Sequence, residues 1–134
     1  MKRTVRGLYY GLPPAAWAVA IFVMSSIRLP PKAPALAFND KIVHGLVFGV
    51  LGLLLLRALA EGLGWSPARA GLLAVLGASV YGALDEFHQL FVPLRKVEFA
   101  DWVADTLGAI ALCALALFLL RRRGAVGHFE KVAE

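Results

Sequence analysis

The stretch from Ala68 to Phe91, ARAGLLAVLGASVYGALDEFHQLF, decides the fold class of this chain. It is almost wholly apolar up to its last turns, and it is long enough to cross about 30 Å of hydrocarbon as a helix. Asp85 and Glu86 then interrupt it close to its end. Charges at such a depth are costly in a bilayer, so they mark a functional site or a packing device.

Three further stretches have a similar length and composition, in a chain of 134 residues that is 60% hydrophobic with a mean hydropathy of +0.72. The four candidate spans run over about 8–27, 41–59, 68–91 and 102–120. No alternation of apolar and polar residues indicates strands, and lipid tolerates only helices or closed barrels. The sequence therefore predicts an all-α, four-helix transmembrane bundle that forms a single domain over residues 1–134.

Basic residues are distributed unequally between the two ends of this predicted bundle. With four spans, the end that holds both termini carries nine lysines and arginines, and the other end carries five. The positive-inside rule then places both termini in the cytoplasm, with Arg121–Arg123 as the strongest anchor. These flanks account for the net charge of +5 and predict no nucleic-acid partner. A cleaved signal ending at Ala35-Leu36-Ala37 is an alternative for the first span, although its apolar stretch is long for such a signal.

Polar residues of the second span lie at its start. Asp40 and His44 are one turn apart on one helix face, whereas Gly45, Gly49 and Gly52 lie roughly on the opposite face. Gly45-x-x-x-Gly49 is typical of close helix packing, so the glycine face is predicted to meet another helix. His44 is either paired locally with Asp40 or part of a shared site.

The third span carries small residues at every fourth position, and the next position in this series is Glu86. The small residues are Ala70, Ala74, Ala78 and Gly82. Because small residues line helix contacts in membranes, Glu86 is predicted to point into the bundle, with Gln89 on the same face. His88 points elsewhere. Pro93 ends the helix soon after Phe91, which puts Glu86 about two turns beneath the helix end.

The fourth span begins with two acids one turn apart. The helix macrodipole accounts for Asp101, but Asp105 lies a turn deeper and is predicted to face the same polar cavity as Glu86. We assign no metal ligand and expect no cofactor, because no His-Glu-x-x-His motif is present and the acids come from three helices. A divalent metal is the alternative. No Gly-x-Ser-x-Gly motif indicates a serine nucleophile.

Three motifs together resemble those of the VanZ-like family of small bacterial membrane proteins. They are Asp40-Lys41-x-x-His44-x-x-x-Phe48, Tyr81-Gly82-x-x-Asp85-Glu86-x-x-Gln89-x-Phe91-Val92-Pro93-x-Arg95, and Asp101-x-x-x-Asp105-x-x-Gly108. The chain departs from the family pattern twice: Leu94 stands where the family usually has glycine, and Asp105 where it usually has asparagine. These departures affect the loop turn and add a negative charge.

The resemblance implies a multi-pass protein of the bacterial cytoplasmic (inner) membrane, whose namesake confers teicoplanin resistance. Combined with the charge distribution, it predicts a polar pocket on the extracytoplasmic face. This pocket is expected to bind or modify a lipid-linked cell-wall precursor or a lipoglycopeptide. Membrane lipids are expected as further partners. Whether a reaction is catalysed stays open. The candidate catalytic residues are Glu86, Asp105, His44 and Asp40, and the candidate binding residues are Gln89, Arg95, Lys41, Asp101 and Asp85.

Each residue has an expected role in this hypothesis. In its enzymatic form Glu86 is the general acid or base, is oriented by Gln89 and is partnered by Asp105 or Asp40. Arg95 and Lys41 clamp a phosphate or carboxylate. Two other functions are carried as alternatives. One is a small proton-coupled exporter, whose key acid belongs near the membrane midplane. The other is a scaffold whose polar residues only join helices.

Overall fold

The computed structural model describes residues 3–27 and 37–132, with side chains over 4–27 and 40–122. Its helices are α1 (Arg3–Ser26), α2 (Ala37–Arg57), α3 (Pro67–Gln89) and α4 (Phe99–Val132), and a single π-helical turn, η2 (Ala58–Gly62), extends α2. Each of the four long helices includes a segment long and apolar enough to cross a membrane. The predicted all-α fold with four membrane-spanning helices is thereby confirmed, and the described residues contain no strand.

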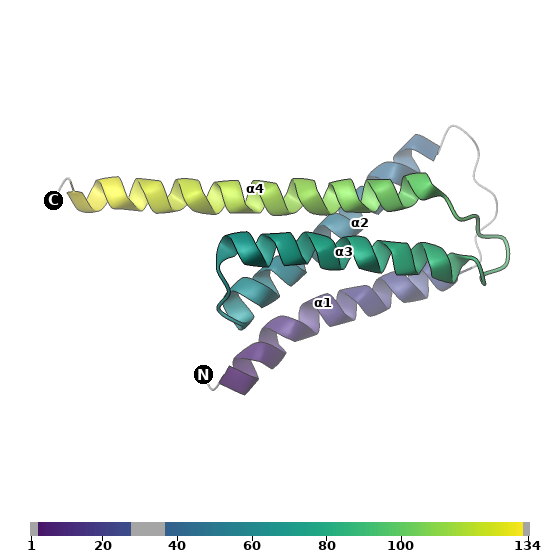
Figure 1. Cartoon of the computed structure of the whole chain (residues 1–134), viewed down its shortest axis with the longest axis horizontal. Helices are drawn as coiled ribbons and strands as arrows, with labels where there is room; N and C mark the ends of the chain where they lie inside the picture. Colours follow the sequence, from purple (N-terminus) through teal and green to yellow (C-terminus); the bar gives the residue numbers. More distant parts are fainter. Residues whose placement is uncertain (1–2, 28–36, 133–134) are drawn as a thin grey trace.

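The helices run alternately up and down (Figure 1). The start of α1 and the end of α4 lie at one end of the bundle, whereas α1 and α3 end, and α2 and α4 begin, at the other. We call this second end the polar end, because the polar residues at the start of α2, the end of α3 and the start of α4 all lie there. Which end faces the cytoplasm rests on charge alone. The side chains of Lys2, Arg3, Arg28, Lys32, Arg123 and Lys131 lie outside those described, as does most of Ala35-Leu36-Ala37.

The ends of two helices differ from those expected. α3 ends at Gln89, because the next three N–H groups fold back in tight turns onto the carbonyls of Phe87, His88 and Gln89. The prediction that Glu86 lies about two turns beneath the helix end is therefore wrong, since Glu86 belongs to the last turn. α4 continues past Leu120 to Val132.

Helices α2 and α4 cross with their backbones in contact. A Cβ added to Gly45 would lie 3.3 Å from the carbonyl oxygen of Ala104, and one added to Gly108 would overlap the carbonyl of Gly45. A Cβ on Gly49 would lie 3.0 Å from the Gly108 carbonyl oxygen. The prediction that the glycine face of α2 meets another helix is confirmed, and that helix is α4.

His44 also reaches α4, so its predicted placement roughly opposite the glycines is wrong. Adjacent residues on a helix differ by about 100°, and the imidazole of His44 extends sideways from α2 toward Asp105. His44 thus stands at the edge of the α2–α4 interface.

Small residues of α3 line the interior, as predicted. Ala70, Ala74 and Ala78 are fully buried, and Gly82 and Glu86 continue the same buried row. Helix α1 covers α2 and α3 from the other side and, within the described residues, does not approach α4. Hydrogen bonds near its middle help to attach it: Trp17 Nε1 donates to the Val47 carbonyl at 2.9 Å, and Tyr81 donates to the Ala18 carbonyl at 2.6 Å.

Candidate functional site

The polar end contains an ionic cluster between the starts of α2 and α4. The ammonium group of Lys41 contacts a carboxylate oxygen of Asp101 and lies 2.5 Å from the carboxylate of Glu98. His44 Nδ1 shares a hydrogen bond of 3.0 Å with Asp105 Oδ1, and His44 Nε2 lies 3.9 Å from Asp101 Oδ2. The two helices that cross at Gly45 and Gly108 are thus also joined by charge.

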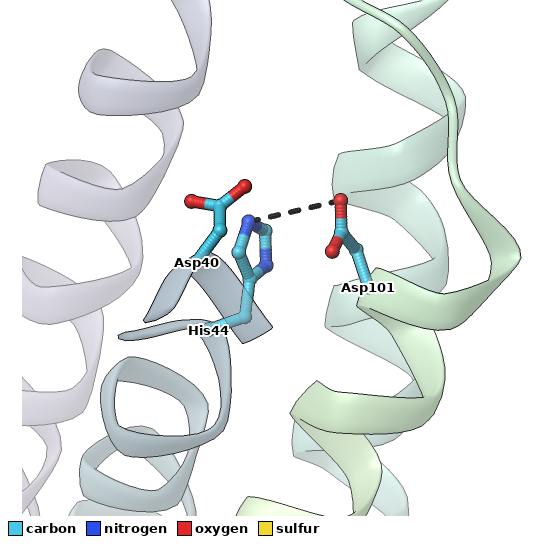
Figure 2. A group of neighbouring side chains, drawn as sticks. All are labelled: Asp40, His44 and Asp101. Carbon is cyan, nitrogen blue, oxygen red and sulfur yellow. Dashed lines mark ion pairs between the residues drawn. The ribbon is translucent and has the colours of Figure 1, made fainter. Parts of the chain in front are cut away.

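Figure 2 shows the outer part of this cluster, where a nitrogen of the His44 ring lies between the carboxylates of Asp40 and Asp101. One ligand atom from each of the three residues lies within 4.8 Å of the other two. Asp40 and His44 come from the first turns of α2, and Asp101 from the first turn of α4. The three residues form a compact group of two carboxylates and an imidazole, and the sequence-based assignment of no metal ligand stays a prediction.

Glu86 is buried beside this cluster. Its side chain is only 6% exposed, and its Oε2 accepts a hydrogen bond of 2.9 Å from the backbone N–H of Glu98. Its carboxylate interacts electrostatically with Asp101, His44 and Asp105. Glu86 Oε1 and Asp105 Oδ2 have no hydrogen-bond partner among the described residues. The cluster therefore contains more carboxyl groups than basic side chains among the described residues.

Gln89 has a partner different from the predicted one. Its Nε2 donates to Asp85 Oδ2 at 3.1 Å, one helical turn away, and both side chains are buried. The expectation that Gln89 orients Glu86 is therefore wrong, because the amide turns toward α1 and α2 while Glu86 faces α4. His88 lies apart from both acids, as predicted, and shares a hydrogen bond of 3.0 Å with Ser26 of α1.

Arg95 belongs to the α3–α4 loop and folds back over the bundle. Its Nη2 donates to the Met24 carbonyl at 3.0 Å, while its buried Nε has no partner among the described residues. The preceding residue, Leu94, has a φ of 70°, in the left-handed region that favours glycine. The loop therefore keeps a left-handed turn at the position where the family usually has glycine.

A cavity of about 250 Å³ lies between α1, α2 and α3 at the polar end. Apolar side chains line most of it, among them Trp17, Ile21, Val47 and Phe48, and five polar candidates line the rest: Asp40, His44, Asp85, Gln89 and Arg95. The other candidates, Lys41, Glu86, Asp101 and Asp105, lie behind this wall. Neither Asp105 nor Glu86 lines this particular cavity, so the prediction that the two share a polar cavity stays a prediction. Lys41 is held by Asp101 and Glu98 and does not line the cavity, so it forms no clamp with Arg95 here.

Sequence reasoning missed Glu98. This loop residue joins two candidates, because its backbone N–H binds Glu86 and its carboxylate binds Lys41. The available signal for Glu98 was its place directly before a helix whose first turn contains another acid, Asp101. It could not indicate a partner on α2.

The fold and the site together define a small multi-pass membrane protein with a buried polar site at one end of its helices. A family model described as VanZ/LLP1 matches residues 8–121, and the chain belongs to this family. The resemblance noted from the motifs is confirmed. No curated protein and no solved structure matches the chain.

Proposed function

We propose that this protein is a cell-envelope protein of the bacterial cytoplasmic (inner) membrane, whose polar end faces outward and binds a molecule with a polar head and an apolar chain. The candidate ligands are a lipid-linked cell-wall precursor and a lipoglycopeptide such as teicoplanin. The outward orientation is supported by the excess of basic residues at the opposite end.

The cavity between α1, α2 and α3 is the observation that carries this proposal. Its wall of Trp17, Ile21, Val47 and Phe48 suits an acyl or polyprenyl chain. At about 250 Å³ it holds only the part of such a ligand nearest the head group. The remainder of the chain then lies along α1, whose other large apolar side chains, such as Val19 and Val23, are exposed.

The polar end of the cavity suits a head group with hydroxyl, amide or amino groups. The carboxylates of Asp40 and Asp85 accept hydrogen bonds, and Arg95 donates them. Arg95 Nε is buried without a partner among the described residues, and a ligand oxygen would satisfy it. Sugars, peptides and phosphates all offer such oxygens.

Binding is favoured over catalysis for this cavity. Glu86, the expected general acid or base, does not line it and neither does Asp105, although the candidates Asp40 and His44 do. Glu86 also lies in the last turn of α3, away from the membrane midplane that a proton-coupled exporter requires.

The test uses two matched substitutions on α1. Ala20 lines the cavity, whereas Ala16, one turn earlier and equally exposed, does not. A susceptible Gram-positive host expresses the wild type, Ala20→Phe, Ala16→Phe or an empty vector, with equal membrane levels verified. We expect the wild type and Ala16→Phe to protect against teicoplanin more than against vancomycin, and Ala20→Phe to lose that protection.

A second readout covers a ligand other than teicoplanin. Lipids that copurify with each protein are identified by mass spectrometry, and a polyprenyl-linked species should accompany the wild type and Ala16→Phe alone. If wild type and Ala20→Phe behave alike in both assays, the cavity is not the binding site. The polar network is then a scaffold.

A further inference from the structure

Asp40, His44 and Asp101 have the spacing of metal ligands. Their ligand atoms lie within 4.8 Å of one another. Two ligand atoms on opposite sides of one ion, each bonded at about 2.1 Å, are separated by about 4.2 Å. The carboxylates of Asp40 and Asp101 flank the His44 ring on opposite sides (Figure 2), so rotation of their side chains would bring their oxygens closer to the ring nitrogen.

The orientation of His44 suits coordination. Its Nδ1 lies 3.0 Å from Asp105 Oδ1, so a ring protonated at Nδ1 donates to this carboxylate and turns the lone pair of Nε2 toward Asp40 and Asp101. A histidine that ligates a metal usually donates its other ring N–H to such a carboxylate. The two oxygens of Asp101 have different neighbours, which is compatible with coordination: Oδ1 contacts the Lys41 ammonium group, and Oδ2 faces the His44 ring.

Unpartnered carboxyl oxygens beside these three residues are a second observation. The carboxylate of Glu86 is almost completely buried and interacts electrostatically with Asp101 and His44, yet its Oε1 has no partner among the described residues. Asp105 is 1% exposed, and its Oδ2 is also without a partner there. A buried carboxyl group is costly unless it is protonated, paired with a cation or bound to a metal. Among the described residues, Lys41 pairs only with Asp101 and Glu98.

We infer that Asp40, His44 and Asp101 bind a divalent transition-metal ion of the Zn²⁺ or Mn²⁺ kind at the polar end of the cavity. One imidazole with carboxylates suits these ions better than Mg²⁺ or Ca²⁺, which prefer oxygen ligands alone. Asp105 is a positioning residue that holds the ring, and Glu86 adds negative charge behind the ligands.

The ion changes what the cavity can bind. Among the described residues that line the cavity, the acids are Asp40 and Asp85 and the one strongly basic residue is Arg95. A divalent ion beside Asp40 reverses that balance and favours an anionic head group such as a phosphate. The site itself does not rest on the proposed function, because the ion needs no ligand in the cavity.

The experiment uses the full chain in detergent, stripped with a chelator and then transferred to chelator-free buffer. ZnCl₂, MnCl₂, MgCl₂ or CaCl₂ is added, and bound metal per chain and thermal unfolding are both measured. We expect one equivalent of Zn²⁺ or Mn²⁺ and a rise in the unfolding temperature. Neither MgCl₂ nor CaCl₂ should match it at equal concentration.

Three variants make the result specific. Asp40→Asn keeps the size of the side chain and leaves the contacts of Lys41 with Asp101 and of His44 with Asp105 in place, so it is a conservative test of the site. It and His44→Gln should weaken binding by about tenfold or more. His88→Gln, at the same end but paired with Ser26, is the matched control and should bind like the wild type.

Two results would overturn the inference. One is a stripped protein that binds less than a stoichiometric amount of every metal and unfolds at an unchanged temperature. The other is equal loss of binding in His44→Gln and His88→Gln. Because these measurements use the metal alone, they are independent of the cavity assays with Ala20→Phe.

Discussion

The contact between Gly45 and Gly108 predicts a large effect of one methyl group. In Gly108→Ala the new Cβ would lie 2.6 Å from Gly45 Cα and overlap the Gly45 carbonyl. Carbon atoms in contact prefer about 3.5–4.0 Å, so α2 and α4 must separate by about 1 Å or more. Both obstructing atoms are backbone, so no side-chain rotation can relieve the overlap.

The free energy of unfolding should fall by about 1–3 kcal/mol, the usual cost of overpacking. A gain of about 1 kcal/mol in helix propensity offsets part of it. Separation by about 1 Å would also stretch the His44–Asp105 hydrogen bond from 3.0 Å to about 4 Å, beyond hydrogen-bond range. Metal affinity and stability should therefore fall together.

The assay is thermal unfolding in detergent micelles, followed by circular dichroism, with Zn²⁺ binding measured on the same samples. Gly11→Ala is the matched control, because a Cβ on Gly11 would meet nothing within 4 Å. It should leave the unfolding temperature unchanged or raise it. If Gly108→Ala is as stable as Gly11→Ala, the close helix crossing does not exist in the protein.

Three further predictions concern the polar end. Leu94→Val should lower the free energy of unfolding by about 1 kcal/mol while Leu94→Gly should not, because the φ of 70° is strained for a β-branched residue; equal thermal unfolding of the two variants would contradict the left-handed turn. A membrane-impermeant maleimide should label Lys96→Cys on intact cells but label Ser66→Cys only after permeabilisation. The native Cys113 is buried, so it should add little background labelling. The reverse pattern would put the polar end in the cytoplasm. Lys41→Met should lower the free energy of unfolding by roughly 2 kcal/mol, because it removes the cation from Asp101, and should lower it little in an Asp101→Asn background. A double-mutant cycle of unfolding free energies tests this, and additive losses would mean that the two side chains are not coupled.

The fold was predictable because its signals are local. A membrane-spanning helix requires an apolar run of a certain length, and four such runs are visible directly in the sequence. The inward position of Glu86 follows in the same way, since it continues the four-residue repeat that ends at Gly82. The end of α3 at Gln89 was less predictable, because Pro93 limits the helix without fixing which turn closes it.

The contacts of the site were not predictable, because they depend on how the helices rotate and cross. A helical wheel puts Gln89 on the face of Glu86, yet its amide reaches Asp85. Likewise, no sequence pattern assigns Lys41 to Asp101 on α4, or separates the cavity from the ionic cluster behind it. Packing of α1 on one side of α2 and of α4 on the other makes that separation, and His44 stands between the two.

The Gly45–Gly108 crossing also acts as a fulcrum for the rigid rod of α4. Asp101 lies about 10 Å along the helix from this point, so a tilt of about 1° displaces it by about 0.2 Å, as much as metal coordination tolerates. The opposite arm, as far as Arg122, is about 21 Å long and swings about twice as far in the other direction. A tilt of α4 about this crossing would therefore move its two ends in opposite directions, against the contact of Leu117 with Gly71 of α3.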